Sequence, residues 1–222
     1  MLTLTPAPTI TPLDERLSAV ASLVCGAVVA DIGTDHGLLP KHLLESGQVQ
    51  RAIAVEKNEA PASNARESLR GLNAEVRLGD GFEALQPGEV DCATLCGLGG
   101  WLIAGVLSRF PDRLPPRLVL QANRDTPLLR VWALERGYHL ESELMAAGFW
   151  NFVVLSLVKG EGPDPAYDGI PRELAIEFGP RLLRDRHPLL KREVDEREQY
   201  FRDTRALGVH RLLCQARDYL NA

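Results

Sequence analysis

The sequence predicts an α/β protein in which a mostly parallel sheet is followed by a helical C-terminal segment. Apolar runs typical of buried strands alternate with helical patterns from residue 13 to residue 135, which indicates βαβ units. Two further strand-like runs, 138–144 and 149–158, have no helix between them and predict an antiparallel edge. The segment 159–169 is rich in Gly, Pro and Asp and reads as a linker. We therefore expect two domains, 1–160 and 161–222.

The elements of the first domain follow from local patterns. Leu13, Leu17, Val20 and Val24 recur at helical spacing and predict the first helix. The first expected strand, residues 27–32, is apolar throughout except for Asp31, as expected for a strand covered on both faces. The other expected strands are 52–56, 75–78, 90–95 and 117–121. The other expected helices are 38–45, 60–69, 101–110 and 127–135.

The second domain shows two helical stripes. Leu189, Leu190, Val194 and Phe201 predict one long helix. A second stripe covers residues 212–220, with Gly208 in the expected turn. Two helices joined by a short loop predict an antiparallel hairpin.

Composition excludes several classes of protein. The 222 residues are 45% hydrophobic and 25% charged, as in ordinary folded domains. The apolar runs are too short for a membrane span, and no secretory signal precedes residue 13, so we expect a cytoplasmic protein. The four cysteines form no Cys-x-x-Cys pair and are expected to be buried thiols. The five histidines show no metal-ligand spacing, so no metal is expected.

The strongest local signal is the glycine-rich turn at the end of the first strand, Asp31-Ile32-Gly33-Thr34-Asp35-His36-Gly37. Glycine lets the backbone turn sharply and approach a ligand closely. The carboxylates of Asp31 and Asp35 disfavour a pyrophosphate and favour a cationic ligand such as S-adenosylmethionine (SAM). The pattern also departs from G-x-G-x-x-G, so a nicotinamide dehydrogenase is the least expected reading. A tight βα turn without a ligand is the structural alternative.

Acids also end the next two strands. Glu56 follows the glycine turn by about 20 residues, the position of an acid that accepts ribose hydroxyls. Asp80 follows the third strand and could accept from an adenine amino group. Either residue alone could be a surface or turn residue. Together with Asp31 they indicate a nucleoside cofactor at the carboxyl ends of the strands.

The fourth strand ends at Cys96-Gly97-Leu98-Gly99-Gly100, which leaves room for a flat substrate. The Asn/Asp-Pro-Pro-aromatic motif of amino-directed adenine methyltransferases is absent, and so is a Pro-Cys nucleophile. Exocyclic amines and pyrimidine C5 are therefore less expected targets. The sequence also lacks the Gly-x-Ser-x-Gly elbow of α/β-hydrolases.

These motifs, in this order, resemble the TrmK family of bacterial tRNA (adenine-22, N1)-methyltransferases. The resemblance rests on the following segments: Leu13 to Leu17, Ala30 to His36 with Leu39-Pro40, Ala52-Ile53-Ala54 with Glu56 and Pro61, Gly79-Asp80-Gly81, Gly97 to Gly100, Leu120 to Asn123, Arg130 with Trp132, Ala166 to Ile170, and Gly179-Pro180 with Leu182. Three segments depart from the family pattern. They are Cys96 to Gly100, Gln121-Ala122-Asn123 and Trp150-Asn151-Phe152, and the last two bear on substrate choice.

The resemblance implies a Rossmann-like class I SAM-dependent methyltransferase domain followed by a coiled-coil hairpin. It implies methyl transfer from SAM to N1 of adenine 22 in tRNA. The expected catalytic residues are Asp35, to stabilise the cationic product ring, and Asn123, to orient the base. The expected cofactor-binding residues are Asp31, Gly33, Thr34, His36, Glu56, Lys57, Asp80, Gly81, Gly97 and Leu98. The expected substrate-binding residues are Arg16, Gly99, Gly100, Arg184, Arg186, Lys191 and Arg192.

Charge distribution favours RNA binding by the C-terminal segment. The whole chain carries a net charge of -5, yet residues 181–217 hold 10 Lys and Arg against 6 Asp and Glu. The candidate basic face comprises Arg181, Arg184, Arg186, Lys191, Arg192, Arg197, Arg202, Arg205 and Arg211. The alternative is a solvated helix face with mixed charges.

For the whole chain, a small-molecule methyltransferase and a non-catalytic RNA-binding or protein-interaction module remain alternatives. A monomer is expected.

Overall fold

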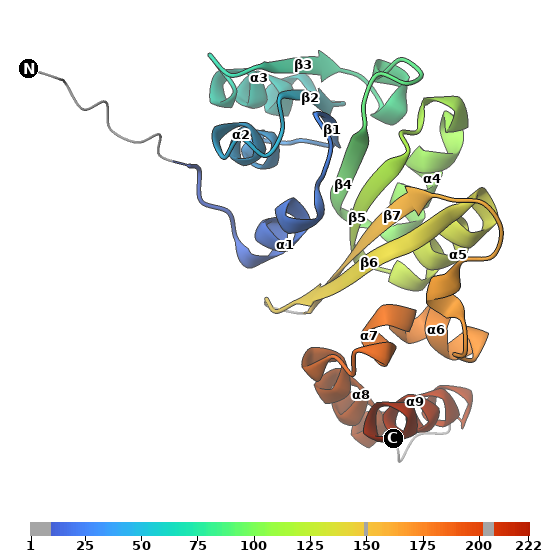
Figure 1. Cartoon of the computed structure of the whole chain (residues 1–222). Coiled ribbons are helices and arrows are strands. Elements are labelled where there is room, and N and C mark those ends of the chain that lie inside the picture. The colour runs from blue at the N-terminus through green and yellow to red at the C-terminus, as the bar shows by residue number, and fades with distance from the viewer. Residues whose placement is uncertain (1–9, 149–150, 202–206) are drawn as a thin grey trace, which may run out of the picture. The chain divides into compact units, whose positions relative to one another are not determined.

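The computed structural model describes residues 10–148, 151–201 and 207–222. Its strands form one seven-stranded sheet in the order β3-β2-β1-β4-β5-β7-β6 (Figure 1), which confirms the predicted α/β class. Contacts between residues divide the chain into two units. Unit 1 comprises 1–96 and 106–116, and unit 2 comprises 97–105 and 117–222. This division does not follow the expected boundary at residue 160, which stays a prediction.

Unit 1 holds the parallel strands β1, β2 and β3 and the part of β4 up to Cys96. The central strand β1 (Val28–Ile32) pairs in parallel with β2 (Arg51–Glu56) and with β4 (Cys92–Gly99), and β3 (Ala74–Leu78) pairs with β2. The registers place Asp31 opposite Ala54 and Thr94. The glycine turn and the residues that follow β2 therefore lie at the same edge of the sheet, as the sequence predicted.

The helices of unit 1 are amphipathic or small-residue helices that shield the strands. They are α1 (Glu15–Leu23), α2 (Leu38–Glu45) and α3 (Glu59–Ser68), with the 3-10 turns η1 (Gly81–Ala84) and η2 (Pro111–Arg113). The strand residues Ala30, Ile53 and Leu95 are fully buried, which explains why these strands are apolar without alternation.

Unit 2 contains the antiparallel edge that the sequence predicted. Strand β5 (Arg117–Arg124) pairs antiparallel with β7 (Phe152–Lys159), which pairs antiparallel with β6 (Tyr138–Ala146). The helix α4 (Gly100–Arg109) begins in this unit, and α5 (Thr126–Arg136) connects β5 to β6. A register shift between Leu140 and Ser142 marks a bulge in β6.

The C-terminal part of unit 2 is helical, but it has more elements than expected. Two short helices, α6 (Arg172–Phe178) and α7 (Pro180–Arg184), precede α8 (Pro188–Phe201) and α9 (Leu207–Asn221). Helices α8 and α9 pack against each other, drawn in dark orange and red in Figure 1. These helices share a core that also includes Met145 from β6. A coiled coil as such stays a prediction.

The expected linker is packed rather than free. It contains the 3-10 turn η3 (Pro165–Tyr167), and Ala166 is only 2% exposed. The Asp164 carboxylate accepts from Ala166 N and Leu140 N, which ties the segment to β6. The Gly, Pro and Asp content therefore reflects turns that are fixed by hydrogen bonds, not a flexible connection.

Other sequence predictions were wrong in detail. Gly208 lies in the first turn of α9 rather than in the preceding turn; it is exposed, and a glycine at an exposed helix end costs little. Cys25 is exposed, Cys96 and Cys214 are partly exposed, and only Cys92 is buried as expected.

Trp150, Arg202 and Arg205 lie outside the described residues. Among the described residues, no helix is long and apolar enough to cross a membrane.

Strands β4 and β5 are longer than their sequence patterns indicated. Gly97 to Gly99 belong to β4, and Ala122 to Arg124 belong to β5. Glycine and asparagine have low strand propensity, which led the local pattern to end both strands early. Side-chain hydrogen bonds stabilise these strand ends despite the low propensity, because Gly97 N donates to Gln121 and Gly97 O accepts from Asn123.

Candidate active site

The glycine turn of unit 1 is fixed by hydrogen bonds to the end of β2. Gly33 N and Thr34 N donate to Val55 O at 2.8 and 3.1 Å, and Asp35 N donates to Glu56 Oε2 at 3.3 Å. The turn needs left-handed backbone at Gly33, Asp35 and Gly37, with φ of 77°, 52° and 69°. Asp adopts the left-handed region more readily than most residues, so Asp35 can occupy this position of the turn at little cost.

Asp31 is buried at the end of β1. It accepts a 2.5 Å hydrogen bond from the Thr94 hydroxyl. Burial raises the pKa of Asp31, and the Thr94 hydrogen bond opposes this only in part. The buried Thr34 hydroxyl lies close enough to Asp31 to lower its pKa as well, but by distance and angle it makes no regular hydrogen bond within the described residues. A buried carboxylate and a hydroxyl without a regular hydrogen bond, next to a glycine turn, are suited to a ligand that brings a cation and a hydrogen-bonding group.

Glu56 is held at the end of β2 by backbone amides. Its Oε1 accepts from Lys57 N at 2.8 Å and Asn58 N at 3.0 Å, and its Oε2 accepts from Asp35 N. The residue is 8% exposed. A carboxylate oxygen can accept more than one hydrogen bond, so Oε2 retains capacity for a ligand hydroxyl. A ribose-binding role for Glu56 stays a prediction.

Asp80 has partners that the sequence did not predict. Arg109 donates to both of its carboxylate oxygens at 2.7 Å, and Lys57 Nζ lies 3.3 Å from Oδ2. The Arg109 hydrogen bonds lower the pKa of Asp80 to about 2, with a smaller contribution from Lys57. The adjacent Gly81 has a φ of 70°, and a Cβ there would lie 2.7 Å from Val106 Cγ1. An adenine contact by Asp80 therefore stays a prediction, and it would share the carboxylate with Arg109.

The remaining expected residues of unit 1 are more exposed. The Asp35 side chain is 69% exposed, and its Oδ1 lies 3.7 Å from His36 Nε2. Arg16, on α1, lies near enough to Asp31 for its charge to favour the ionised carboxylate. The structure thus brings Asp31, Thr34, Asp35 and Glu56 together, with Arg16 within electrostatic reach.

In unit 2, a hydrogen-bond network holds the end of β4. Gly97 N donates to Gln121 Oε1 at 2.9 Å, and Asn123 Nδ2 donates to Gly97 O at 2.7 Å. Gln121 Nε2 donates to Asn123 Oδ1 at 3.2 Å, and Gln121 is fully buried. Sequence reasoning assigned a role to Asn123 but missed Gln121. The signal was present, because a glutamine in a buried strand requires polar partners.

A pocket of about 170 Å³ opens beside Asn123 in unit 2. It includes Ala122 and Asn151, two of the positions at which the sequence departs from the family pattern. Asn151 Nδ2 donates to Glu193 Oε2 at 3.1 Å. The other lining residues are Asp125, Thr126, Pro127, Arg130, Met145, Val153, Glu177, Phe178, Leu182, Leu190 and Glu193.

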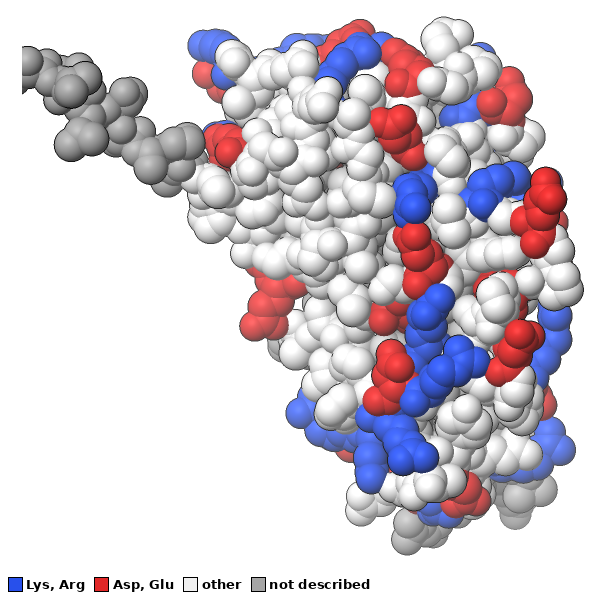
Figure 2. All heavy atoms as spheres, viewed as in Figure 1, with Lys and Arg blue, Asp and Glu red and all other residues white. Residues whose placement is uncertain are grey.

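The basic side chains of the C-terminal helices are mixed with acidic ones. Arg197 pairs with Glu177 at 3.3 Å and lies 3.8 Å from Glu193, and Arg192 lies 3.9 Å from Glu196. Figure 2 shows Lys and Arg interspersed with Asp and Glu rather than forming one unbroken patch on the face drawn. This arrangement agrees with the alternative of a solvated helix face.

Three of the expected RNA-binding residues differ in their surroundings. Arg184 Nη2 donates to Asp168 O, while no side-chain partner is found for Arg186 or Lys191 among the residues that the structure describes. Arg186 has a φ of 48°, in the left-handed region. Of these three residues, Arg186 in the connection between α7 and α8 and Lys191 on α8 therefore remain open to a phosphate.

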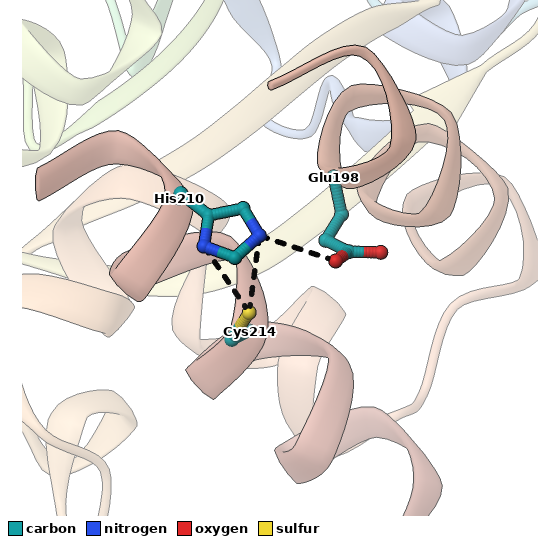
Figure 3. Close-up of side chains that lie close together, drawn as sticks. All are labelled: Glu198, His210 and Cys214. Atoms are coloured by element: carbon teal, nitrogen blue, oxygen red, sulfur yellow. Dashed lines mark hydrogen bonds and ion pairs between the residues drawn. The ribbon is translucent and has the colours of Figure 1, made fainter. Parts of the chain in front are cut away.

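One group of potential metal ligands lies between α8 and α9. Glu198 Oε1 lies 3.3 Å from His210 Nε2, and Cys214 Sγ lies 3.8 Å from the same nitrogen (Figure 3). The expectation of no metal considered the spacing of cysteines and of histidines separately and missed this combination. Arg217 Nη1 also lies 3.4 Å from Glu198 Oε2, so the guanidinium of Arg217 already balances the charge of the buried carboxylate. We interpret the group as an ion-pair cluster that joins the two helices.

Comparisons with known proteins agree with this geometry. Residues 13–151 match the family model described as "Methyltransferase domain". The tRNA (adenine(22)-N(1))-methyltransferase of Bacillus subtilis is 33% identical over 195 residues, which cover 85% of this chain and 82% of the relative.

The chain belongs to the tRNA (adenine(22)-N(1))-methyltransferase family.

Solved structures of the family share the fold over nearly the whole chain. The B. subtilis M1A22 tRNA methyltransferase TrmK has a TM-score of 0.82 at 30% identity, covering 95% of this chain and 98% of that chain. A Streptococcus pneumoniae putative tRNA (m1A22) methyltransferase, solved in complex with S-adenosyl-L-methionine, has a TM-score of 0.80 at 27% identity and the same coverage. The Rossmann-like methyltransferase fold implied by the resemblance is confirmed.

Proposed function

We propose that this protein transfers a methyl group from SAM to N1 of the adenine at position 22 of tRNA. The observation that carries the proposal is the family membership over 85% of the chain, combined with the intact cluster of Asp31, Asp35 and Glu56 at the strand ends. Action on tRNA implies the cytoplasm as its compartment.

The cluster in unit 1 fits SAM. Glu56 Oε2 is available to a ribose hydroxyl, and the Thr34 hydroxyl beside Asp31 offers a further polar contact. The buried Asp31 carboxylate, whose pKa is raised by burial, would be stabilised in its ionised form by the ammonium of the bound cofactor. We assign Gly33, His36, Lys57, Asp80 and Gly81 to the rim of the cofactor site. We also assign a cofactor-binding role to Gly97 and Leu98, which lie near the end of β4. When bound, SAM supplies an electrophilic methyl group.

The chemistry requires alignment and charge stabilisation rather than a covalent enzyme intermediate. Adenine N1 carries an in-plane lone pair that accepts the methyl group, and the product ring is cationic. The exposed Asp35 carboxylate supplies negative charge for that ring and can accept from the adenine amino group. Asn123 Nδ2 has two hydrogens; one bonds to Gly97 O, and the other can orient the base. We assign Asp35 and Asn123 these roles.

We assign the substrate contacts to Arg16, Gly99 and Gly100, and to the cations at the connection between α7 and α8. Adenine N1 lies on the Watson–Crick edge, so the base must be unpaired when it reacts. Contacts to several phosphates predict that tRNA binding weakens steeply as salt increases.

The decisive experiment incubates the purified protein with labelled SAM and unmodified tRNA and maps methylated nucleosides by digestion and mass spectrometry. We expect N1-methyladenosine at position 22. Asp35→Ala should abolish it while SAM binding, measured by calorimetry, is retained.

Two other outcomes would select the alternatives. SAM binding with methylation of small metabolites but not of tRNA would favour a small-molecule methyltransferase. SAM binding without transfer to any substrate would favour a non-catalytic RNA-binding or protein-interaction module. A failure of Asp35→Ala to bind SAM would move Asp35 from catalysis to cofactor binding.

A further inference from the structure

A tryptophan is exposed directly after the glycines that end β4. Trp101 is the second residue of α4, and 72% of it is exposed; Leu102 beside it is 55% exposed. The next residue, Ile103, is fully buried and anchors the helix. Trp is highly buried on average, so an indole in solvent at this place gains nothing from the fold. Its position is better explained by a ligand than by packing.

An exposed arginine comes from the adjoining strand of the same unit. Arg124, near the end of β5, has a side chain that is 82% exposed, and its nearest acid, Asp125, lies 3.8 Å away. A Cβ on Gly99 would lie 3.4 Å from Arg124 Nε, and a Cβ on Gly100 would lie 2.4 Å from Asp125 O. The backbone segments that carry Trp101 and Arg124 are therefore in direct contact. We call Trp101, Leu102 and Arg124 the indole surface.

The chemistry of the indole surface suits nucleic acid. Every nucleobase has a flat face that stacks on an aromatic ring, and this contact is tolerant of sequence. An arginine beside the ring can bind a phosphate or stack on a base. The surface directly follows the strand end held by Asn123, the residue assigned to orient the target base. An adenine that reacts at N1 must leave its pair, which exposes neighbouring bases to such a ring.

We propose that Trp101 stacks on a nucleobase of the tRNA next to the target adenine, and that Arg124 binds a phosphate of the same segment. This inference rests on the proposed function and adds a substrate-binding site to it. A protein partner on this surface is the competing occupant, and the experiment below separates the two.

The test measures the steady-state kinetics of the full chain on an unmodified tRNA transcript. Trp101→Leu keeps an apolar side chain and removes the ring, and Trp101→Phe keeps a ring. We expect Trp101→Leu to raise the KM for tRNA about 5- to 140-fold, the range that corresponds to a stacking contribution of about 1–3 kcal/mol. The dissociation constant for SAM should not change. Trp101→Phe should recover most of the affinity.

Arg124→Ala should raise the KM for tRNA and lower the slope of affinity against salt by about one phosphate contact. Arg136→Ala is the matched control, because this arginine is also exposed and belongs to the same unit. Arg124 precedes the first residue of α5, whereas Arg136 is its last residue, so Arg136 lies a full helix length away. It should leave the KM within twofold.

Two results would overturn the inference. One is a KM for tRNA that stays within twofold in Trp101→Leu, which would leave the surface to a protein partner. The other is a loss of SAM binding or of thermal stability in that variant, which would make the ring structural. If the wild type binds SAM but methylates no tRNA, the proposed function itself fails, and this result is distinct from both.

Discussion

A buried ion pair in unit 2 joins the sheet to the C-terminal helices. Arg130 on α5 donates from Nε to Glu143 Oε1 on β6 at 2.8 Å, and Nη1 donates to Ile176 O on α6 at 2.7 Å. Glu143 Oε2 accepts from Leu182 N on α7 at 3.3 Å. The two side chains are 2% and 0% exposed. One charge pair therefore connects four elements without access to solvent.

The substitution Glu143→Gln tests this pair, because it removes the charge and keeps the shape. The amide oxygen can still accept from Arg130, but the amide nitrogen takes the place of the oxygen that accepts from Leu182 N. The guanidinium then keeps a buried charge without a counterion. Removing one partner of a buried pair costs about 3–5 kcal/mol. At about 2–4 °C per kcal/mol for a chain of this size, the thermal midpoint should fall by about 6–20 °C.

The assay is urea and thermal unfolding followed by tryptophan fluorescence. Trp132 is buried on the same helix as Arg130 and reports on this unit. Glu141→Gln is the matched control, because Glu141 lies on the same strand and pairs with Arg117 at the surface, with side chains that are 41% and 34% exposed. We expect a loss below about 1 kcal/mol for the control.

The reasoning would be refuted by a Glu143→Gln variant that loses less than about 1 kcal/mol, or no more than Glu141→Gln loses. Either result would mean that water or a shift of α6 and α7 supplies the missing counter-charge. A second variant gives an independent check. Gly179→Ala keeps both charges, but its Cβ would lie 2.4 Å from Glu143 Oε2 at a φ of 92°, so it should also destabilise the unit.

Three further predictions concern the candidate site and its unit. Glu56→Gln should weaken SAM binding about 10- to 150-fold in calorimetry, because hydrogen bonds to a charged group contribute about 1.5–3 kcal/mol; unchanged affinity would remove Glu56 from the cofactor site. Glu89→Gln should destabilise the protein by about 1–2 kcal/mol at pH 7, because hydrogen bonds from Arg77 lower the pKa of Glu89 from 4.5 to about 2. That stabilisation is fully present above pH 4.5 and is lost as the pH falls toward 2, so the difference in unfolding free energy between variant and wild type should shrink over this window, and a constant difference would contradict the assignment. Gln121→Leu should lower kcat more than it raises the KM for SAM, because Gly97 and Asn123 lose their shared partner; Gln121→Glu should restore the bond to Gly97 N, and equal kcat in all three proteins would exclude a positioning role.

The local pattern was sufficient for the order of elements and for part of the site. Strands buried on both faces are apolar without interruption, and helices show a periodic stripe, so both are visible in one sequence. The turn at Gly33 to Gly37 and the acids Asp31 and Glu56 were recognisable because they follow strands whose carboxyl ends share one edge. The sequence pattern did not reveal α6 and α7 as two separate helices, because each is too short to show a helical repeat of apolar residues.

The tertiary structure decided which polar side chains meet. Thr94 bonds to Asp31 across 63 positions of sequence, Arg109 to Asp80 across 29, and Gln121 to Gly97 across 24. No local periodicity encodes these partners, since each is chosen by strand register and by the need to satisfy a buried polar group. The sequence by itself therefore determined the fold class, the position of the glycine turn and the family. Only the folded chain decided which charges are paired, how far β4 and β5 extend, and which side chains, such as Trp101, remain open to solvent.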